Sequence, residues 1–183
     1  MKTIGWGKPG IYIRKTTEQY FTKVPNPAEN TTQLETTKGD RMEAKDEGGE
    51  LAAVKHKKST YVLRYGIRDA AETQQPIAHV DGIVEDEYAV VVVPENAKAP
   101  GIYIEFSEVS VDDSFASEEG GIITYEHAVL AATSGKSVKH GTMTVTESSG
   151  NISISANGHD FNASTSLNGP APAQSGSGSG GTG

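Results

Sequence analysis

Residues 60–69 read Thr-Tyr-Val-Leu-Arg-Tyr-Gly-Ile-Arg-Asp, and this stretch decides the fold class. One set of alternate positions holds Tyr61, Leu63, Tyr65 and Ile67, and the other set includes Arg64 and Arg68. A period of two places one set of side chains on a buried face and the other set in solvent. We therefore predict a long, half-buried β-strand over 60–69.

The same alternation recurs in residues 101–111 and 121–131. In the first of these we expect Ile102, Ile104 and Phe106 to share the buried face. Residues 87–93 are apolar on both faces, which predicts a strand covered on both sides. Shorter strands are predicted at 10–15, 19–23, 32–36, 41–45, 142–146 and 151–155, with a hairpin turn at 147–150.

Helix signals are few, and we expect one short flanking helix at 73–84, interrupted by Pro76. The strand-rich pattern favours a mainly β domain, built as a sandwich or partial barrel. We expect this domain to span residues 1–146. Residues 147–162 are then an added hairpin or extension, and residues 163–183 a flexible tail rich in Gly, Ser and Pro.

One internal segment differs from the predicted core. Residues 36–50 carry many charges and three glycines, and long loops of this kind in compact domains tend to be functional. A solvated loop is the alternative interpretation. We predict an arm that reaches onto a neighbouring subunit, with candidate contact residues Thr36, Lys38, Asp40, Arg41, Glu43, Lys45, Asp46, Glu47 and Glu50.

The charge is distributed unevenly along the chain. Residues 1–68 contain 13 Lys and Arg against 8 Asp and Glu, a net of +5, whereas residues 69–135 contain 14 acids and one lysine, a net of −13. An acidic middle third opposes contact with phosphates, so ordinary nucleic-acid binding is not expected. The chain has no cysteine, which suits folding in a reducing cytosol. Its longest apolar run, at 88–93, is too short to cross a bilayer.

No catalytic constellation is evident. The five histidines are scattered without metal-ligand spacing, and His127 is interpreted as a partnered core or interface residue. The pairs Asp112-Asp113 and Glu118-Glu119 are interpreted as exposed turn charges, because they lack the ligand spacing of a calcium loop. We expect no enzyme activity, no cofactor and no metal.

Several short segments together resemble the major tail, or tail tube, proteins of bacteriophages and prophages. These segments are Gly5-Trp6-Gly7-Lys8-Pro9-Gly10, Thr36-Thr-Lys-Gly-Asp40 with Glu47-Gly-Gly-Glu50, Ser59-Thr-Tyr-Val-Leu63 and Gly141-Thr-Met-Thr-Val145. The resemblance implies a protomer that joins copies of itself into rings, commonly hexameric, whose inner sheets form one continuous barrel. The rings stack, with a long loop bridging to the next ring, into a virion tube for DNA passage.

The resemblance further implies other tail proteins as partners, DNA only as transient cargo, no membrane, and assembly in the host cytoplasm. Two alternatives stay open. A tube protein of a type-VI-secretion-like injection system shares this architecture. A ligand- or carbohydrate-binding β-sandwich needs a solvent-facing aromatic platform, for which Tyr103 and Trp6 are the candidates. A surface adhesin needs an export signal, which we do not expect from the first residues of this sequence.

Overall fold

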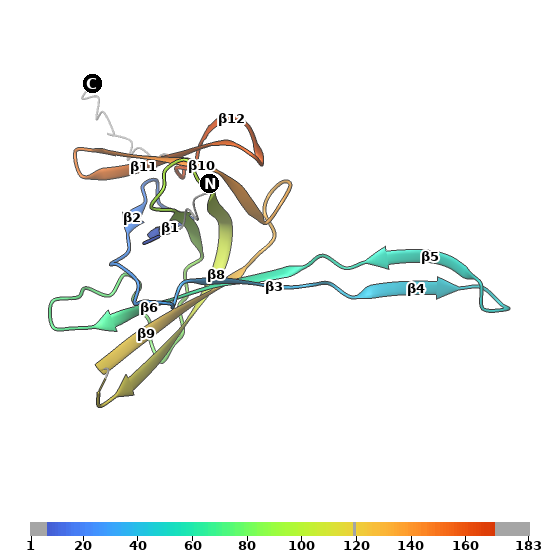
Figure 1. Cartoon of the computed structure of the whole chain (residues 1–183), viewed down its shortest axis with the longest axis horizontal. Helices are drawn as coiled ribbons and strands as arrows, with labels where there is room; N and C mark the ends of the chain where they lie inside the picture. The colour runs from blue at the N-terminus through green and yellow to red at the C-terminus, as the bar shows by residue number, and fades with distance from the viewer. Residues whose placement is uncertain (1–6, 119, 171–183) are drawn as a thin grey trace, which may run out of the picture.

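The computed structural model describes residues 7–118 and 120–170. In these residues the fold is built from antiparallel β-strands, with no helix and no closed barrel (Figure 1). The strands are β1 (Gly10–Lys15), β2 (Thr22–Lys23), β3 (Gln33–Thr37), β4 (Arg41–Lys45), β5 (Leu51–His56), β6 (Thr60–Asp69), β7 (Tyr88–Val93), β8 (Gly101–Ala116), β9 (Gly120–Val129), β10 (Val138–Ser148), β11 (Asn151–Gly158) and β12 (Phe161–Ser166).

The long strand β8 connects two parts of one branched sheet. One path runs β12-β11-β10-β8-β7-β1-β2, and a branch continues from β8 through β9 and β6 to β3. Residues 101–104 of β8 pair with β10, and residues 107–116 pair with β9. A strand long enough to serve two sheets must bend between them, and a bulge is the usual way to do so.

The bend in β8 corrects one sequence prediction. Tyr88 of β7 pairs with Ser107, but Val90, two residues on, pairs with Ile104, so three intervals on β8 oppose two on β7. Beyond this bulge Val109 and Val111 join Ile104 in the same core cluster. Phe106, expected on that face, is not among the buried residues.

The first core lies between the β1-β7-β8 sheet and the β8-β9-β6-β3 branch. The alternating residues predicted for 60–69 supply Leu63, Tyr65 and Ile67 to it, each at most 1% exposed. Tyr125 of β9 stacks on Tyr65 with ring centroids 5.5 Å apart. The predicted alternation of this strand is confirmed.

A second core lies on the opposite face of β1 and β7, under β10, β11 and β12. Ala89 and Val91 face this side, and Val90 and Val92 face the first core, which confirms that β7 is covered on both faces. Tyr103 also belongs to the second core and is 8% exposed. It is therefore not the solvent-facing aromatic that the sequence suggested.

The short helix expected at 73–84 is not formed. Gln75 accepts a 2.6 Å hydrogen bond from the Tyr125 hydroxyl, and the Ile77 side chain is buried in the first core. These two anchors hold the segment as a loop, and Pro76 between them cannot donate a helical hydrogen bond. None of the described residues forms a helix that is long and apolar enough to span a membrane.

The C-terminal β-structure extends further than predicted. The predicted boundary at residue 146 falls inside β10, and β12 continues to Ser166, past residue 163 where the flexible tail was expected to begin. Leu167 is 3% exposed, and its carbonyl accepts a hydrogen bond from Arg14 at 3.2 Å. The predicted tail residues 171–183 and the candidate platform residue Trp6 lie outside the described residues.

Candidate assembly surface

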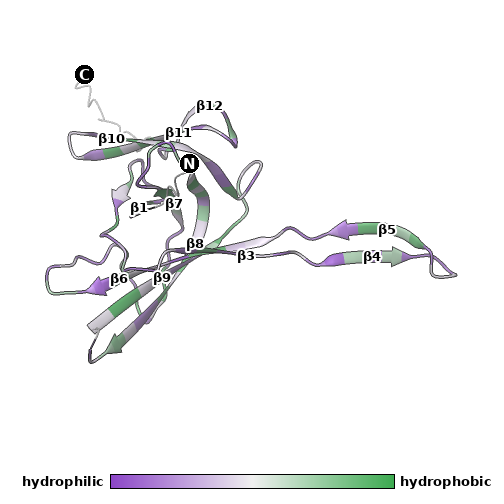
Figure 2. Cartoon of the chain, in the orientation of Figure 1, coloured by the Kyte–Doolittle hydropathy of each residue, from purple (hydrophilic) through white to green (hydrophobic). Residues whose placement is uncertain are grey.

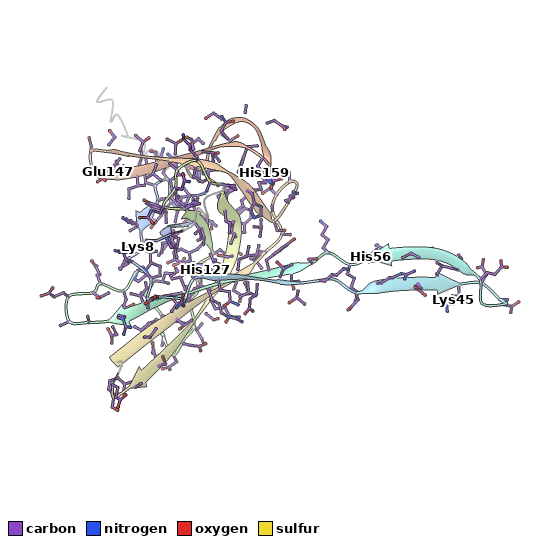
Figure 3. All side chains as sticks on the ribbon, in the orientation of Figure 1. Lys8, Lys45, His56, His127, Glu147 and His159 are labelled. Carbon is purple, nitrogen blue, oxygen red and sulfur yellow. The ribbon has the colours of Figure 1, made fainter. Side chains whose placement is uncertain are left out.

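The predicted arm is a two-stranded β-hairpin that projects away from the domain (Figure 1). It consists of β4 and β5, which pair with each other in a separate two-stranded sheet. Every residue of both strands is exposed. Side chains labelled along it, such as Lys45, lie far from the domain (Figure 3).

The base of the arm is continuous with the β3–β6 ladder. The last pair of that ladder is Thr37 with Thr60, and beyond it the Lys57 amide donates to the Asp40 carbonyl at 2.9 Å. The two chain segments approach closely at Gly39, where an added Cβ would lie 2.0 Å from the Lys57 carbonyl oxygen. A larger residue at this position would push the segments apart.

The tip of the arm is a short turn whose backbone conformation favours glycine. Gly48 and Gly49 have φ values of +103° and +83°, a region that other residues rarely adopt. The Asp46 amide donates to the Glu50 carbonyl at 3.0 Å and closes the turn. The arm ends in an acidic tip because Asp46, Glu47 and Glu50 all lie here.

The two faces of the arm differ in chemistry. Residues paired directly across an antiparallel ladder share a face, so the first face carries Arg41, Glu43 and Lys45 with Leu51, Val54 and His56. The second face carries Met42, Ala44, Ala53 and Lys55. Met42 is 53% exposed, Leu51 51% and Val54 41%. Figure 2 shows these hydrophobic stretches between polar ones on β4 and β5.

The structure distributes the candidate contact residues along the whole arm. Thr36 lies in β3 at the base, Lys38 and Asp40 in the connection, Arg41, Glu43 and Lys45 on β4, and Asp46, Glu47 and Glu50 at the tip. Arg41 and Glu43 form an ion pair at 2.8 Å, and Asp40 forms another at 3.6 Å with Lys57, which is not among the candidates. Sequence analysis missed the second strand, β5, because its apolar residues Leu51-Ala-Ala-Val54 are consecutive and show no alternation.

A second exposed surface is the outer face of the β3-β6-β9-β8 branch. The pairing register places four acids on this face, opposite the side chains that enter the first core. They are Glu35, Glu108, Asp112 and Glu126. The same face carries Arg64 and Arg68 on β6. We call this surface the acidic sheet face.

Arg64 lies between two of these acids. It contacts Glu126 at 2.7 Å across the β6–β9 pair and also forms an ion pair with Glu35 on β3. These hydrogen bonds raise the pKa of the Arg64 guanidinium above its ordinary value. Such half-exposed ion pairs contribute little to stability, but they fix side-chain positions across three strands.

His127 is a buried, fully partnered core residue, as predicted. Its Nε2 lies 3.0 Å from the Tyr65 hydroxyl and its Nδ1 2.9 Å from Ser107 Oγ. Because the Ser107 hydroxyl donates to the Tyr88 carbonyl at 2.8 Å, its oxygen must accept from Nδ1–H, and Nε2 must accept from Tyr65. Burial lowers the pKa of His127 to about 3. The labelled side chain lies inside the domain in Figure 3.

The carboxylate pairs fall in different places from those expected. Asp112 and Asp113 lie within strand β8, on opposite faces, rather than in a turn. Glu118 is exposed at the end of the hairpin, and Glu119 lies outside the described residues. Asp112 and Asp113 therefore do not converge on one ion.

Two histidines that are 19 positions apart in sequence are brought together by the C-terminal strands. The rings of His140 and His159 lie 5.6 Å apart, beside Asp160. Lys136 and the His140 amide hold the pKa of the Asp160 carboxyl well below its usual range. The sequence spacing gave no hint of this cluster, and the turn itself is formed by His159 and Asp160 rather than by the preceding Asn157-Gly158, which belongs to β11.

No protein-family model matches the chain, and no curated protein is significantly similar to it in sequence. The resemblance to tail tube proteins therefore stays a prediction.

Proposed function

We propose that this chain is a structural subunit that joins copies of itself into stacked rings, forming a tube of the phage-tail type through which DNA passes. The observation that carries the proposal is the arm. A two-stranded hairpin alone is at best marginally stable in water, and all residues of β4 and β5 are exposed. A contact with a neighbouring subunit supplies the missing partner.

The exposed apolar side chains of the arm support this interpretation. Met42, Leu51 and Val54 are each more than two-fifths exposed, and they occur on both faces of the hairpin. Apolar groups displayed this far from the domain are typical of interaction sites. The surrounding charges then select the neighbour and fix the register.

Open sheet edges favour ring formation. In the described part of the chain, β3 pairs with β6 alone, and β12 with β11 alone. Such edges present unpaired backbone groups that can template pairing with another chain. Closing the sheets into a ring removes this liability. The acidic sheet face is suited to line the lumen, because negative charge opposes contacts with DNA phosphates.

The test removes the arm without disturbing the ladder beneath it. Residues 38–59 are replaced by Asn-Gly, which closes a two-residue turn between the paired residues Thr37 and Thr60. The truncated protein should keep β-type circular dichroism and cooperative unfolding but lose rings and tubes in negative-stain microscopy. Assembly equal to that of the parent would refute the proposal.

A second variant tests whether the acidic side chains of the arm contribute to assembly. Four arm acids are replaced with Ser, and the matched control replaces four exposed acids elsewhere. The arm set is Asp40, Glu43, Asp46 and Glu47, and the control set is Glu29, Glu72, Glu85 and Glu118. Both lose the same charge, so only a site-specific contact makes the arm variant assemble less well. High salt should weaken assembly of the parent in the same direction, because exposed ion pairs are screened.

A further inference from the structure

The turn between β11 and β12 is fixed onto the start of β10. His159 and Asp160 form this two-residue turn, because Gly158 pairs directly with Phe161. The Asp160 amide donates to the His140 carbonyl at 2.9 Å, and the His140 amide donates to Asp160 Oδ2 at 2.9 Å. This reciprocal pair places three potential metal ligands at one point of the surface. His159 is labelled there in Figure 3.

We propose that His140, His159 and Asp160 form a Zn²⁺ site that ties the β11–β12 turn to β10. The proposal is independent of the assembly proposed above.

The separations between the ligand atoms of the three side chains are close to those around a tetrahedral zinc ion. The Nδ1 atoms of His140 and His159 lie 3.6 Å and 3.3 Å from Asp160 Oδ2. All three ligand atoms lie within 4.8 Å of one another. A tetrahedral zinc ion with bonds of about 2.0–2.1 Å separates its ligands by about 3.4 Å. Small side-chain rotations therefore suffice to close the site.

The ligand set suits zinc. Imidazole nitrogen and carboxylate oxygen are both common zinc ligands, and two histidines with one carboxylate leave a fourth position for water. The His140 and His159 side chains are 39% and 56% exposed, so an ion and its water can reach them from solvent. Asp160, only 13% exposed, is held in place from within.

Lys136 offers a test that distinguishes a metal site from a turn that binds no metal. Its ammonium contacts Asp160 Oδ1 at 2.8 Å, and so occupies one carboxylate oxygen while Oδ2 faces the imidazoles. The lysine positions the carboxylate but also places a positive charge near the proposed ion. Removing that charge should strengthen zinc binding, whereas it would have no such effect on a turn that binds no metal.

Zinc bound here would act on the second core. Phe161, the residue after Asp160, packs in that core and lies 6.4 Å from the Tyr103 ring. An ion that binds the folded chain in preference to the unfolded chain raises the unfolding midpoint. A zinc-dependent rise in thermal midpoint is therefore a readout that is independent of the binding isotherm.

The experiment titrates metal-stripped full-length protein with ZnCl₂ in a calorimeter, with MgCl₂ as a second titrant. We expect one Zn²⁺ per chain and no saturable Mg²⁺ binding. His140→Ala and His159→Ala should each weaken zinc binding at least tenfold, and Lys136→Gln should strengthen it. The matched control is His56→Ala, which removes an exposed histidine of the arm and should bind like the parent.

A structural readout completes the test. In NMR spectra, zinc should shift the imidazole signals of His140 and His159 and leave the buried His127 unchanged. The proposal is overturned if the parent binds no zinc with a Kd below about 1 mM, which corresponds to only about 4 kcal/mol. It is equally overturned if both histidine variants bind zinc as the parent does.

Discussion

Lowering the pH below 6.5 should destabilise this protein through His127. In the folded chain burial lowers its pKa to about 3, from an ordinary value of 6.5. The unfolded chain therefore binds a proton below pH 6.5 that the folded chain does not bind. Stability rises with pH wherever the unfolded state binds more protons, so the contribution is lost as the pH falls from 6.5 towards 3.

The expected magnitude follows from the same shift. Between pH 6.5 and pH 4.5 the histidine is increasingly protonated in the unfolded chain and stays neutral in the folded chain. The free energy of unfolding therefore falls by about 1.4 kcal/mol per pH unit. The loss by pH 4.5 is therefore about 3 kcal/mol, equivalent to a fall of about 5–10 °C in thermal midpoint at this chain length. The ionised Asp160 carboxylate also contributes stability that is lost on acidification. This loss occurs over a lower pH range, because the pKa of Asp160 is depressed in the folded chain.

The assay is urea unfolding at a series of pH values for the parent and for His127→Gln. Glutamine can hydrogen-bond to Tyr65 and Ser107 but cannot be protonated, so the variant should lose the slope whatever its stability at pH 7. Dilute protein is needed because the isoelectric point is about 5.1. Equal slopes for both proteins would refute the reasoning. If the variant fails to fold, NMR of the parent provides the test instead. The His127 imidazole signal should then stay unshifted down to pH 4.5, and a shift would refute the reasoning.

Three further predictions concern packing, the arm and the exposed apolar surface. Leu167→Ala should destabilise the domain by about 2–4 kcal/mol in urea unfolding, because the side chain is buried; the exposed control Val80→Ala should change it by less than about 0.5 kcal/mol. Gly39→Ala should leave the unfolding midpoint unchanged but speed amide exchange in the arm, because the Cβ meets the Lys57 carbonyl. Phe115→Ser, at an 81% exposed position, should leave stability within about 0.5 kcal/mol of the parent and weaken ring formation. Unchanged stability in Leu167→Ala, unchanged exchange in Gly39→Ala, or parental assembly in Phe115→Ser would each contradict the corresponding argument.

Strands with strong alternation could be predicted from sequence with nearly correct bounds. β1, β4 and β6 begin and end at the predicted residues, and β7 differs by one residue at its start. The signal is strong in these strands because each buries one face, or both, against a core. β4 is the exception, since it is exposed throughout and was identified from its short alternation alone.

The missed features depend on contacts that are distant in sequence. β12 contains few apolar residues after Phe161, so its pairing with β11 follows from the preceding turn rather than from its composition. The bulge in β8 arises because that strand serves two sheets, and a count of alternating residues cannot reveal it. The expected helix at 73–84 is replaced by a loop because Gln75 and Ile77 are bound by the core.

The candidate site divides in the same way. The charged arm could be located from residues 36–50, since charge and glycine are local signals. Its length could not, because β5 continues it to His56 through residues that look like an ordinary apolar stretch. The histidine cluster was not predictable at all, because the hydrogen bonds between the β11–β12 turn and β10 bring it together.

The arm and the acidic sheet face are positioned by the same two strands. β6 carries Arg64 on the acidic face and begins at Thr60, where the chain returns from the arm, and β3 runs beside it and leads into the arm after Thr37. If a neighbour binds the arm as proposed, a force on the arm would be transmitted to the β3–β6 ladder, which carries Glu35 and Arg64, and through Arg64 to Glu126 on β9. Ring contacts made through the arm would in this way fix the orientation of the acidic face, and its charges would point in one direction in every subunit. A subunit whose arm was truncated would keep the same face but have no neighbour to align it, which is why loss of assembly with retained folding is the decisive result.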